Sequence, residues 1–97
     1  MDKAASTPKM KKETIKKELK KIISSYNSLK WDEITDDEKL HPNLISDGDI
    51  PFYRDDIFKA FPIDYKESTI LANKLIDSYN SVKSLSEFIY KNVYNKD

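Results

Sequence analysis

The first candidate for chemistry is an acidic turn, Ser46-Asp47-Gly48-Asp49, which contains the only glycine of the 97-residue chain. Clustered carboxylates bind calcium in EF-hand loops, where glycine occupies position 6. Those loops need ligands at positions 1, 3 and 12 that the chain does not supply. With Gly48 at position 6, it has Asn43, Ile45 and Arg54 there. The spacing therefore excludes an EF-hand.

The glycine also predicts the shape of this turn. Glycine adopts positive φ angles that other residues resist, and glycine, asparagine and aspartate dominate the turns that need them. Because the chain has one glycine to place, we expect Gly48 to have a positive φ. Gly48→Ala would then cost about 1 kcal/mol or more.

Other catalytic and cofactor sites find little support in the sequence. His41 is the only histidine and cysteine is absent, so the ligands of a common zinc site are missing. A single glycine excludes a glycine-rich phosphate loop. Residue types alone do not exclude a Ser–His–Asp hydrolase, but a small helical chain has little room for its oxyanion hole and pocket. We therefore expect no catalytic residue, no metal and no cofactor.

Charge is distributed unevenly, although the net charge is zero. Residues 1–30 carry nine lysines against three carboxylates, and residues 31–68 carry eleven carboxylates against four cations. Two interpretations remain open. Either the basic first helix packs beside the acidic middle and partly neutralises it, or one of the two surfaces binds an oppositely charged partner.

The acidic middle of the chain is the preferred candidate for partner binding. Phe52 lies off the apolar stripe set by Tyr53 and Ile57, so we expect it to face solvent among carboxylates. An exposed aromatic side chain beside charged residues is typical of an interface anchor. The predicted partner-binding residues are Asp47, Asp49, Phe52, Asp55 and Asp56.

Nucleic acid binding is a weaker alternative. It would use the lysines on the polar side of the first helix, Lys16, Lys17, Lys20 and Lys21. Lysines without arginines favour phosphate contact over base reading. The chain as a whole is neutral, however, and no helix-turn-helix spacing is apparent.

Four main helices are predicted to position these residues. Apolar residues at three- and four-residue steps predict the first helix over 12–29. The second begins at Asp49 or Ile50 and ends at Pro62, the third has Asp64 as its N-cap, and the fourth has Ser84 as its N-cap. A further short helix is predicted after Thr35.

Strand patterns are absent from the sequence, so we expect an all-α fold, a small four-helix bundle with a long loop between helices 1 and 2. Residues 1–10 lack an apolar pattern and are predicted to be a flexible tail before a single domain, 11–97. No apolar run approaches the ~18 residues of a membrane span. The expected location is cytoplasmic.

A ten-residue repeat is also present. Residues 21–30 and 74–83 are identical at seven of ten positions and share the sequence Ser-Tyr-Asn-Ser. Both copies are predicted to end a helix, with the tyrosine buried and the asparagine suited to the helix end. A duplicated binding element is the functional alternative.

The order of parts over residues 12–93 resembles acyl and peptidyl carrier proteins. Ser81-Val-Lys-Ser-Leu-Ser-Glu-Phe-Ile-Tyr90 is similar to the start of their last helix. Carriers attach phosphopantetheine to a serine in Asp-Ser-Leu at the start of helix 2, whereas this chain has Asp47-Gly48-Asp49 there. The resemblance implies a degenerate carrier without that serine.

The sequence thus favours a non-enzymatic helical protein of the inhibitor, immunity or regulatory type, which binds a basic protein through its acidic surface. The degenerate carrier is the first alternative and the nucleic-acid accessory protein is the second.

Overall fold

The structure is a computed structural model that describes residues 11–94, so the predicted tail, 1–10, lies outside it. Within these residues it contains no strand, which confirms the all-α class. The same stretch holds no helix of the length and apolar character that a membrane crossing requires. Its elements are α1 (Lys12–Ser24), η1 (Trp31–Glu33), η2 (Asp47–Asp49), α2 (Ile50–Ala60), α3 (Tyr65–Lys74), α4 (Val82–Ile89) and the π-helical turn η3 (Tyr90–Tyr94).

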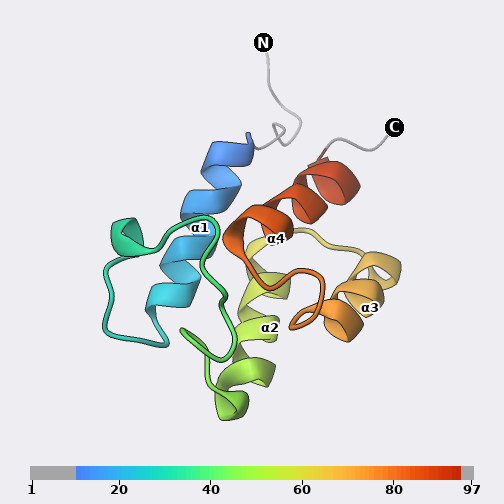
Figure 1. Cartoon of the computed structure of the whole chain (residues 1–97). Coiled ribbons are helices and arrows are strands. Elements are labelled where there is room, and N and C mark those ends of the chain that lie inside the picture. The colour runs from blue at the N-terminus through green and yellow to red at the C-terminus, as the bar shows by residue number, and fades with distance from the viewer. Residues whose placement is uncertain (1–10, 95–97) are drawn as a thin grey trace.

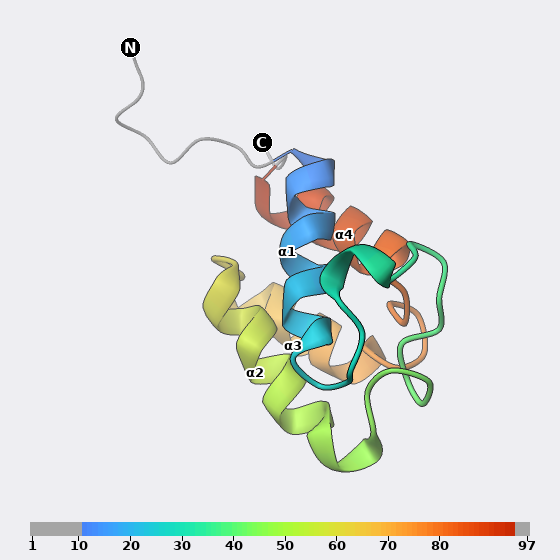
Figure 2. The same ribbon diagram turned by 90° about the vertical axis from the view of Figure 1, so that its left-hand side faces the viewer.

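Helix α1 is central, because it packs against both α4 and α2 (Figures 1 and 2). Its residues Ile15, Leu19 and Ile23 recur every four positions and are fully buried. The start of α1 and the end of the α4–η3 segment lie at the same end of the molecule, where Lys12 Nζ is 5.3 Å from the centre of the Tyr90 ring. Helix α3 lies at the edge, and Leu71 is its one buried residue.

The segment between α1 and α2 is part of the hydrophobic core. Ile34, Leu40 and Ile45 are exposed by only 2 %, 1 % and 0 %. The buried apolar residues come from every α-helix and from this connection: Ile15, Leu19, Ile23, Ile34, Leu40, Ile45, Tyr53, Ile57, Phe61, Leu71, Leu75, Val82, Leu85, Phe88, Ile89 and Tyr94. The hydrophobic core is therefore complete only when the connection between α1 and α2 is held in place.

The helix predicted after Thr35 is absent, and residues 36–38 form a turn instead. The Asp36 backbone carbonyl accepts a hydrogen bond from Lys83 N at 3.0 Å, which ties this segment to the start of α4. The one helical turn nearby is η1, in which Lys30 N donates to Glu33 Oε1 at 2.8 Å.

Two predicted helix ends are corrected by side-chain hydrogen bonds. Helix α1 ends at Ser24 rather than at 29, because Asn27 Nδ2 donates a hydrogen bond to the Ile23 carbonyl oxygen at 2.9 Å. Helix α4 begins at Val82, since Ser81 rather than Ser84 is the N-cap and its Oγ accepts from Ser84 N at 3.1 Å. The predicted start of α2 and the Asp64 cap of α3 are confirmed, and α2 ends at Ala60, two residues before Pro62.

Three large apolar residues in or after the helices are only partly covered. Leu29, Ile70 and Ile76 are 39 %, 38 % and 43 % exposed. Leu29 and Ile76 lie beyond the ends of α1 and α3. Within α3 only Leu71 is buried, so little of this helix packs against the rest of the molecule. No neighbouring helix therefore covers these side chains fully, although they are apolar.

The hydroxyl of Tyr53 predicts an unusual response to mutation. This side chain is 2 % exposed and its hydroxyl has no hydrogen-bond partner within residues 11–94. Tyr53→Phe should therefore raise the free energy of unfolding by about 1 kcal/mol, because an unpaired buried hydroxyl is costly. Tyr26→Phe is the matched control, since its hydroxyl donates to Asp56. It should lower stability by about 1 kcal/mol. Urea unfolding measures both, and a destabilised Tyr53→Phe would show that the hydroxyl does have a partner.

Candidate functional site

Three of the five predicted contact residues share the outward face of α2. Phe52 is 64 % exposed, and Asp55 and Asp56 follow it at the three- and four-residue spacing that places side chains on one helix face. Tyr53 and Ile57 lie on the opposite, buried face. The expectation that Phe52 lies off the apolar stripe is therefore confirmed.

The remaining two residues precede α2 in the η2 turn. Asp49 is the residue before the helix, and its Oδ2 accepts from Ser46 Oγ at 3.1 Å. Asp47 has a 93 % exposed side chain whose Oδ1 contacts Nε2 of His41. His41 is mostly covered, with 19 % of its side chain exposed. The acidic surface, defined here as Asp47, Asp49, Phe52, Asp55 and Asp56, is thus tied to the connection at His41.

Tyr26 belongs to this region, although sequence reasoning missed it as a contact residue. Its hydroxyl donates to Asp56 Oδ2 and its ring meets that of Tyr53 edge-on, with 6.1 Å between the ring centres. Burial raises the pKa of Tyr26 well above its usual value, and the nearby carboxylates of Asp56, Asp49 and Asp55 raise it further. The predicted helix over 12–29 included Tyr26, so the sequence held no signal for this contact.

The expected positive φ of Gly48 is wrong. Gly48 lies in η2, where Asp49 N donates to Ser46 O at 3.0 Å and the chain runs directly into α2. Such a right-handed turn is open to any residue. A Cβ atom added at Gly48 would meet no atom within 4 Å.

Gly48→Ala should therefore be neutral or should raise the free energy of unfolding by up to about 1 kcal/mol, because alanine restricts the unfolded chain. The positive φ expected from the sequence implied instead that this substitution lowers the free energy of unfolding by a similar amount. Chemical denaturation distinguishes the two, and a loss of 1 kcal/mol or more would mean that the turn needs glycine after all.

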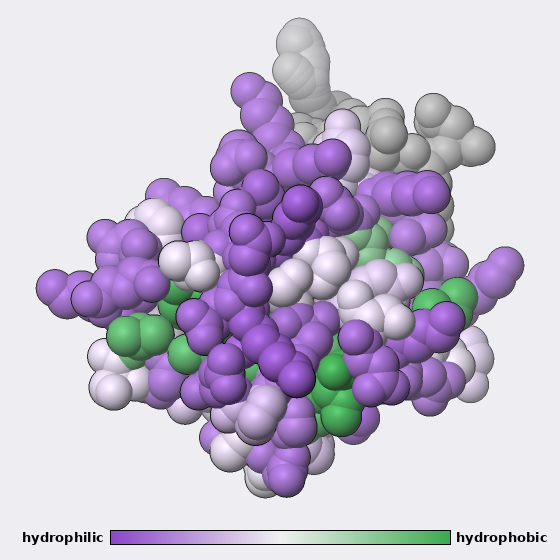
Figure 3. Space-filling model, in the orientation of Figure 1, coloured by the Kyte–Doolittle hydropathy of each residue, from purple (hydrophilic) through white to green (hydrophobic). Residues whose placement is uncertain are grey.

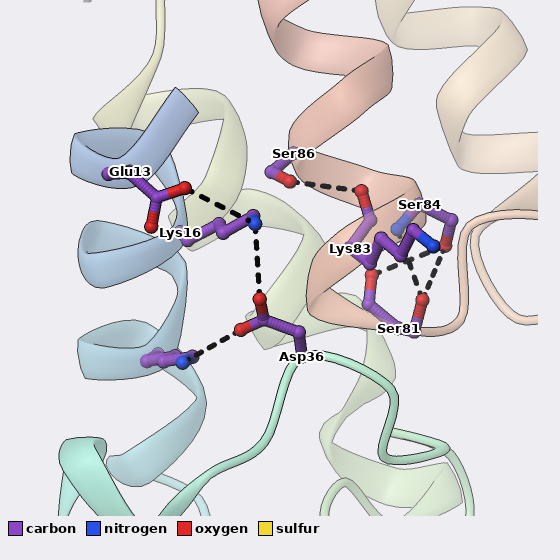
Figure 4. Close-up of polar contacts among 8 residues, drawn as sticks. Glu13, Lys16, Asp36, Ser81, Lys83, Ser84 and Ser86 are labelled. Atoms are coloured by element: carbon purple, nitrogen blue, oxygen red, sulfur yellow. Dashed lines mark hydrogen bonds and ion pairs between the residues drawn. The ribbon is translucent and has the colours of Figure 1, made fainter. Parts of the chain in front are cut away.

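The lysines of α1 make contacts within the molecule. Lys16 Nζ and Lys20 Nζ lie 3.1 and 2.8 Å from the Asp36 carboxylate (Figure 4). Hydrogen bonds from Lys20 and Lys16 lower the pKa of Asp36, and the bond to Asp36 raises the pKa of Lys16. This one carboxylate joins the connection to α1.

Lys17 and Lys21 lie over the ring of Trp31, with their Nζ atoms 5.3 and 6.0 Å from its centre. Cation–π contacts of this kind contribute about 0.5–1 kcal/mol at exposed sites. All four lysines of the nucleic-acid alternative therefore have a partner inside the molecule. This geometry agrees with the interpretation that the acidic middle partly neutralises the basic helix.

The Asp36 pair predicts a pH dependence of stability. Because the folded pKa of Asp36 is lowered, its contribution is complete above the unfolded aspartate value of about 3.9 and is lost as pH falls through the folded pKa. Asp36→Asn should lower stability at pH 7 by up to about 1 kcal/mol and flatten its decline below pH ~4. The control is Asp37→Asn, because Asp37 has no ion pair in the described chain. Equal acid profiles for the two variants would contradict the pair.

No group of three or more histidine, aspartate or glutamate residues within residues 11–94 is arranged to hold a metal ion. An open hollow of about 590 Å³ lies where the end of α3 meets the start of α4, and polar side chains form most of its lining. Hydrophilic residues dominate the face seen in Figure 3, with apolar residues in separate spots.

Comparison with known proteins adds no relative. No protein-family model, curated protein or solved structure matches this chain.

Proposed function

We propose that this chain is a small non-catalytic helical protein that binds a basic protein through its acidic surface, as an inhibitor, immunity or regulatory protein of the cytoplasm. The proposed scaffold is a small four-helix bundle in which the long connection between α1 and α2 positions that surface.

The exposure of Phe52 carries this proposal. A phenyl ring that is 64 % exposed loses the stabilisation that burial would give, and a partner that covers it would supply that stabilisation. Carboxylates surround it, and Asp55 has no hydrogen bond or ion pair in the described part of the chain. An apolar anchor beside unpaired charge suits a partner with a basic rim, because the charges steer association and the anchor slows dissociation.

The basic helix supports the nucleic-acid alternative less well. Each of its four candidate lysines already contacts Asp36 or Trp31. A phosphate would have to compete with these contacts, whereas Asp55 and Phe52 are open to a partner.

The degenerate carrier differs from the proposal in a measurable property. Gly48 offers no hydroxyl for a prosthetic group, and the nearby Ser46 Oγ donates to Asp49. Intact mass of the protein from its source cell decides this point, because an attached arm would add a fixed increment and would overturn the non-carrier assignment.

The partner can be captured with a photo-crosslinking amino acid at position 52. The matched control carries it at position 65, because Tyr65 is 86 % exposed and lies outside the acidic surface. A basic protein captured at position 52 and not at 65 supports the proposal. Nucleic acid captured through α1, with no protein at 52, contradicts it.

With that partner, we expect different kinetics from two variants. Phe52→Ala should speed dissociation by an amount worth about 2 kcal/mol, because it removes the anchor. Asp55→Lys should slow association and weaken its salt dependence. Neither side chain is in the core, so thermal unfolding should change little. Stopped-flow or surface-based kinetics measures both rates. Charge reversal at Lys17 and Lys21 is the control, and binding lost only there would assign the interface to α1.

A further inference from the structure

The two asparagines of the ten-residue repeat hold the same part of the chain. Asn27 and Asn80 occupy equivalent positions in residues 21–30 and 74–83. Asn80 binds the backbone of His41, and Asn27 binds the backbone carbonyl of Leu44. The repeat therefore holds both ends of a short segment, 41–44, from the chain that follows α1 and from the connection between α3 and α4.

The contact of Asn80 is specific to an amide side chain. Its Oδ1 accepts from His41 N at 2.8 Å, and its Nδ2 donates to His41 O at 2.7 Å. The backbone of Asn80 adds a third bond, because its carbonyl accepts from Leu40 N at 3.0 Å. A backbone N–H only donates and a carbonyl only accepts, so these bonds fix the orientation of the amide. Aspartate would lose the donor, and alanine would lose both side-chain bonds.

Asn27 makes the corresponding contact at the other end. Its Nδ2 donates to Ile23 O at 2.9 Å and to Leu44 O at 3.3 Å, while its Oδ1 accepts from Leu29 N at 2.9 Å. One side chain thus ends α1 and holds the connection.

We call Asn27 and Asn80, with the 41–44 backbone that they bind, the asparagine clamp. His41 links this clamp to the acidic surface. Its backbone is held by Asn80, and Nε2 of its ring contacts Asp47, which lies in the turn before α2. We infer that Asn80, with Asn27, is a positioning residue for the acidic surface and acts through His41 on Asp47. This inference rests on the proposed function for its binding role, while the clamp itself is testable in the free protein.

The test is the ¹⁵N spectrum of the His41 imidazole in the full-length protein, where the single histidine gives unambiguous ring signals. Asn80→Ala and Asp47→Ala should shift these signals in the same direction, because either change separates the ring from the carboxylate. Asn80→Asp keeps the acceptor for His41 N but replaces the donor with a charged carboxylate oxygen that faces the His41 carbonyl, so it should shift the ring signals as well. Asn73→Ala, at an exposed position on α3, is the control and should give none.

Amide exchange provides the second readout. In Asn80→Ala the His41 amide should exchange roughly tenfold faster, because its side-chain acceptor is gone. Amides in the middle of α1 should keep their protection. Unchanged ring signals in a folded Asn80→Ala protein, or an equal loss of protection everywhere, would overturn the positioning role. If Asn80→Ala does not fold, Asn80→Asp decides in the same way.

Partner binding separates this inference from the function it rests on. Asn80→Ala should slow association as Asp47→Ala does, without changing the dissociation rate that Phe52 controls. If the ring signals shift as expected but Phe52→Ala and Asp55→Lys leave the captured partner unaffected, the clamp stands and the acidic-surface proposal fails. If the ring signals do not shift but those variants weaken binding, the clamp alone fails.

Discussion

The fold depends on how the long connection between α1 and α2 is fixed. Three of its side chains, Ile34, Leu40 and Ile45, complete the core, so its backbone must be held in place between the two helices. Ordering each residue costs about 1–2 kcal/mol in backbone entropy. Polar side chains from the flanking elements offset part of this cost: Lys16 and Lys20 bind Asp36, and Asn27 and Asn80 bind the backbone further along. The one glycine there, Gly48, has no positive φ.

The same contacts explain the uneven charge of the sequence. The basic helix meets Asp36 and Trp31 from the acidic middle, so much of its charge serves the attachment of the connection. Such pairs are modest individually when they are partly exposed. Their value is geometric, because they select one path for a chain with few other constraints. Asp55 of α2 is exposed and forms no ion pair with these lysines in the described residues, so its charge stays at the surface.

Features that act locally were predictable from the sequence. Pro51 and Pro62 delimit α2, and the Asp64 cap needs only its own next turn. The exposure of Phe52 followed from its place off the helix stripe. What sequence reasoning missed depends on contacts between distant residues. The Tyr26–Asp56 bond spans 30 positions and the Asn80–His41 bonds span 39. The positive φ predicted for Gly48 was wrong because glycine permits such an angle without requiring it.

The acidic surface is not uniform in what its residues require of a partner. Asp47 and Asp49 lie at the start of α2, where carboxylates interact favourably with the helix dipole and need no binding role to explain them. Asp56 accepts a hydrogen bond from Tyr26, so its carboxylate is explained by a contact within the molecule. Phe52 and Asp55 have neither explanation. They lie beyond the first residue of the helix on its outward face, one apolar and one charged, and among residues 11–94 no contact accounts for them. The case for a binding surface therefore depends chiefly on these two neighbouring side chains.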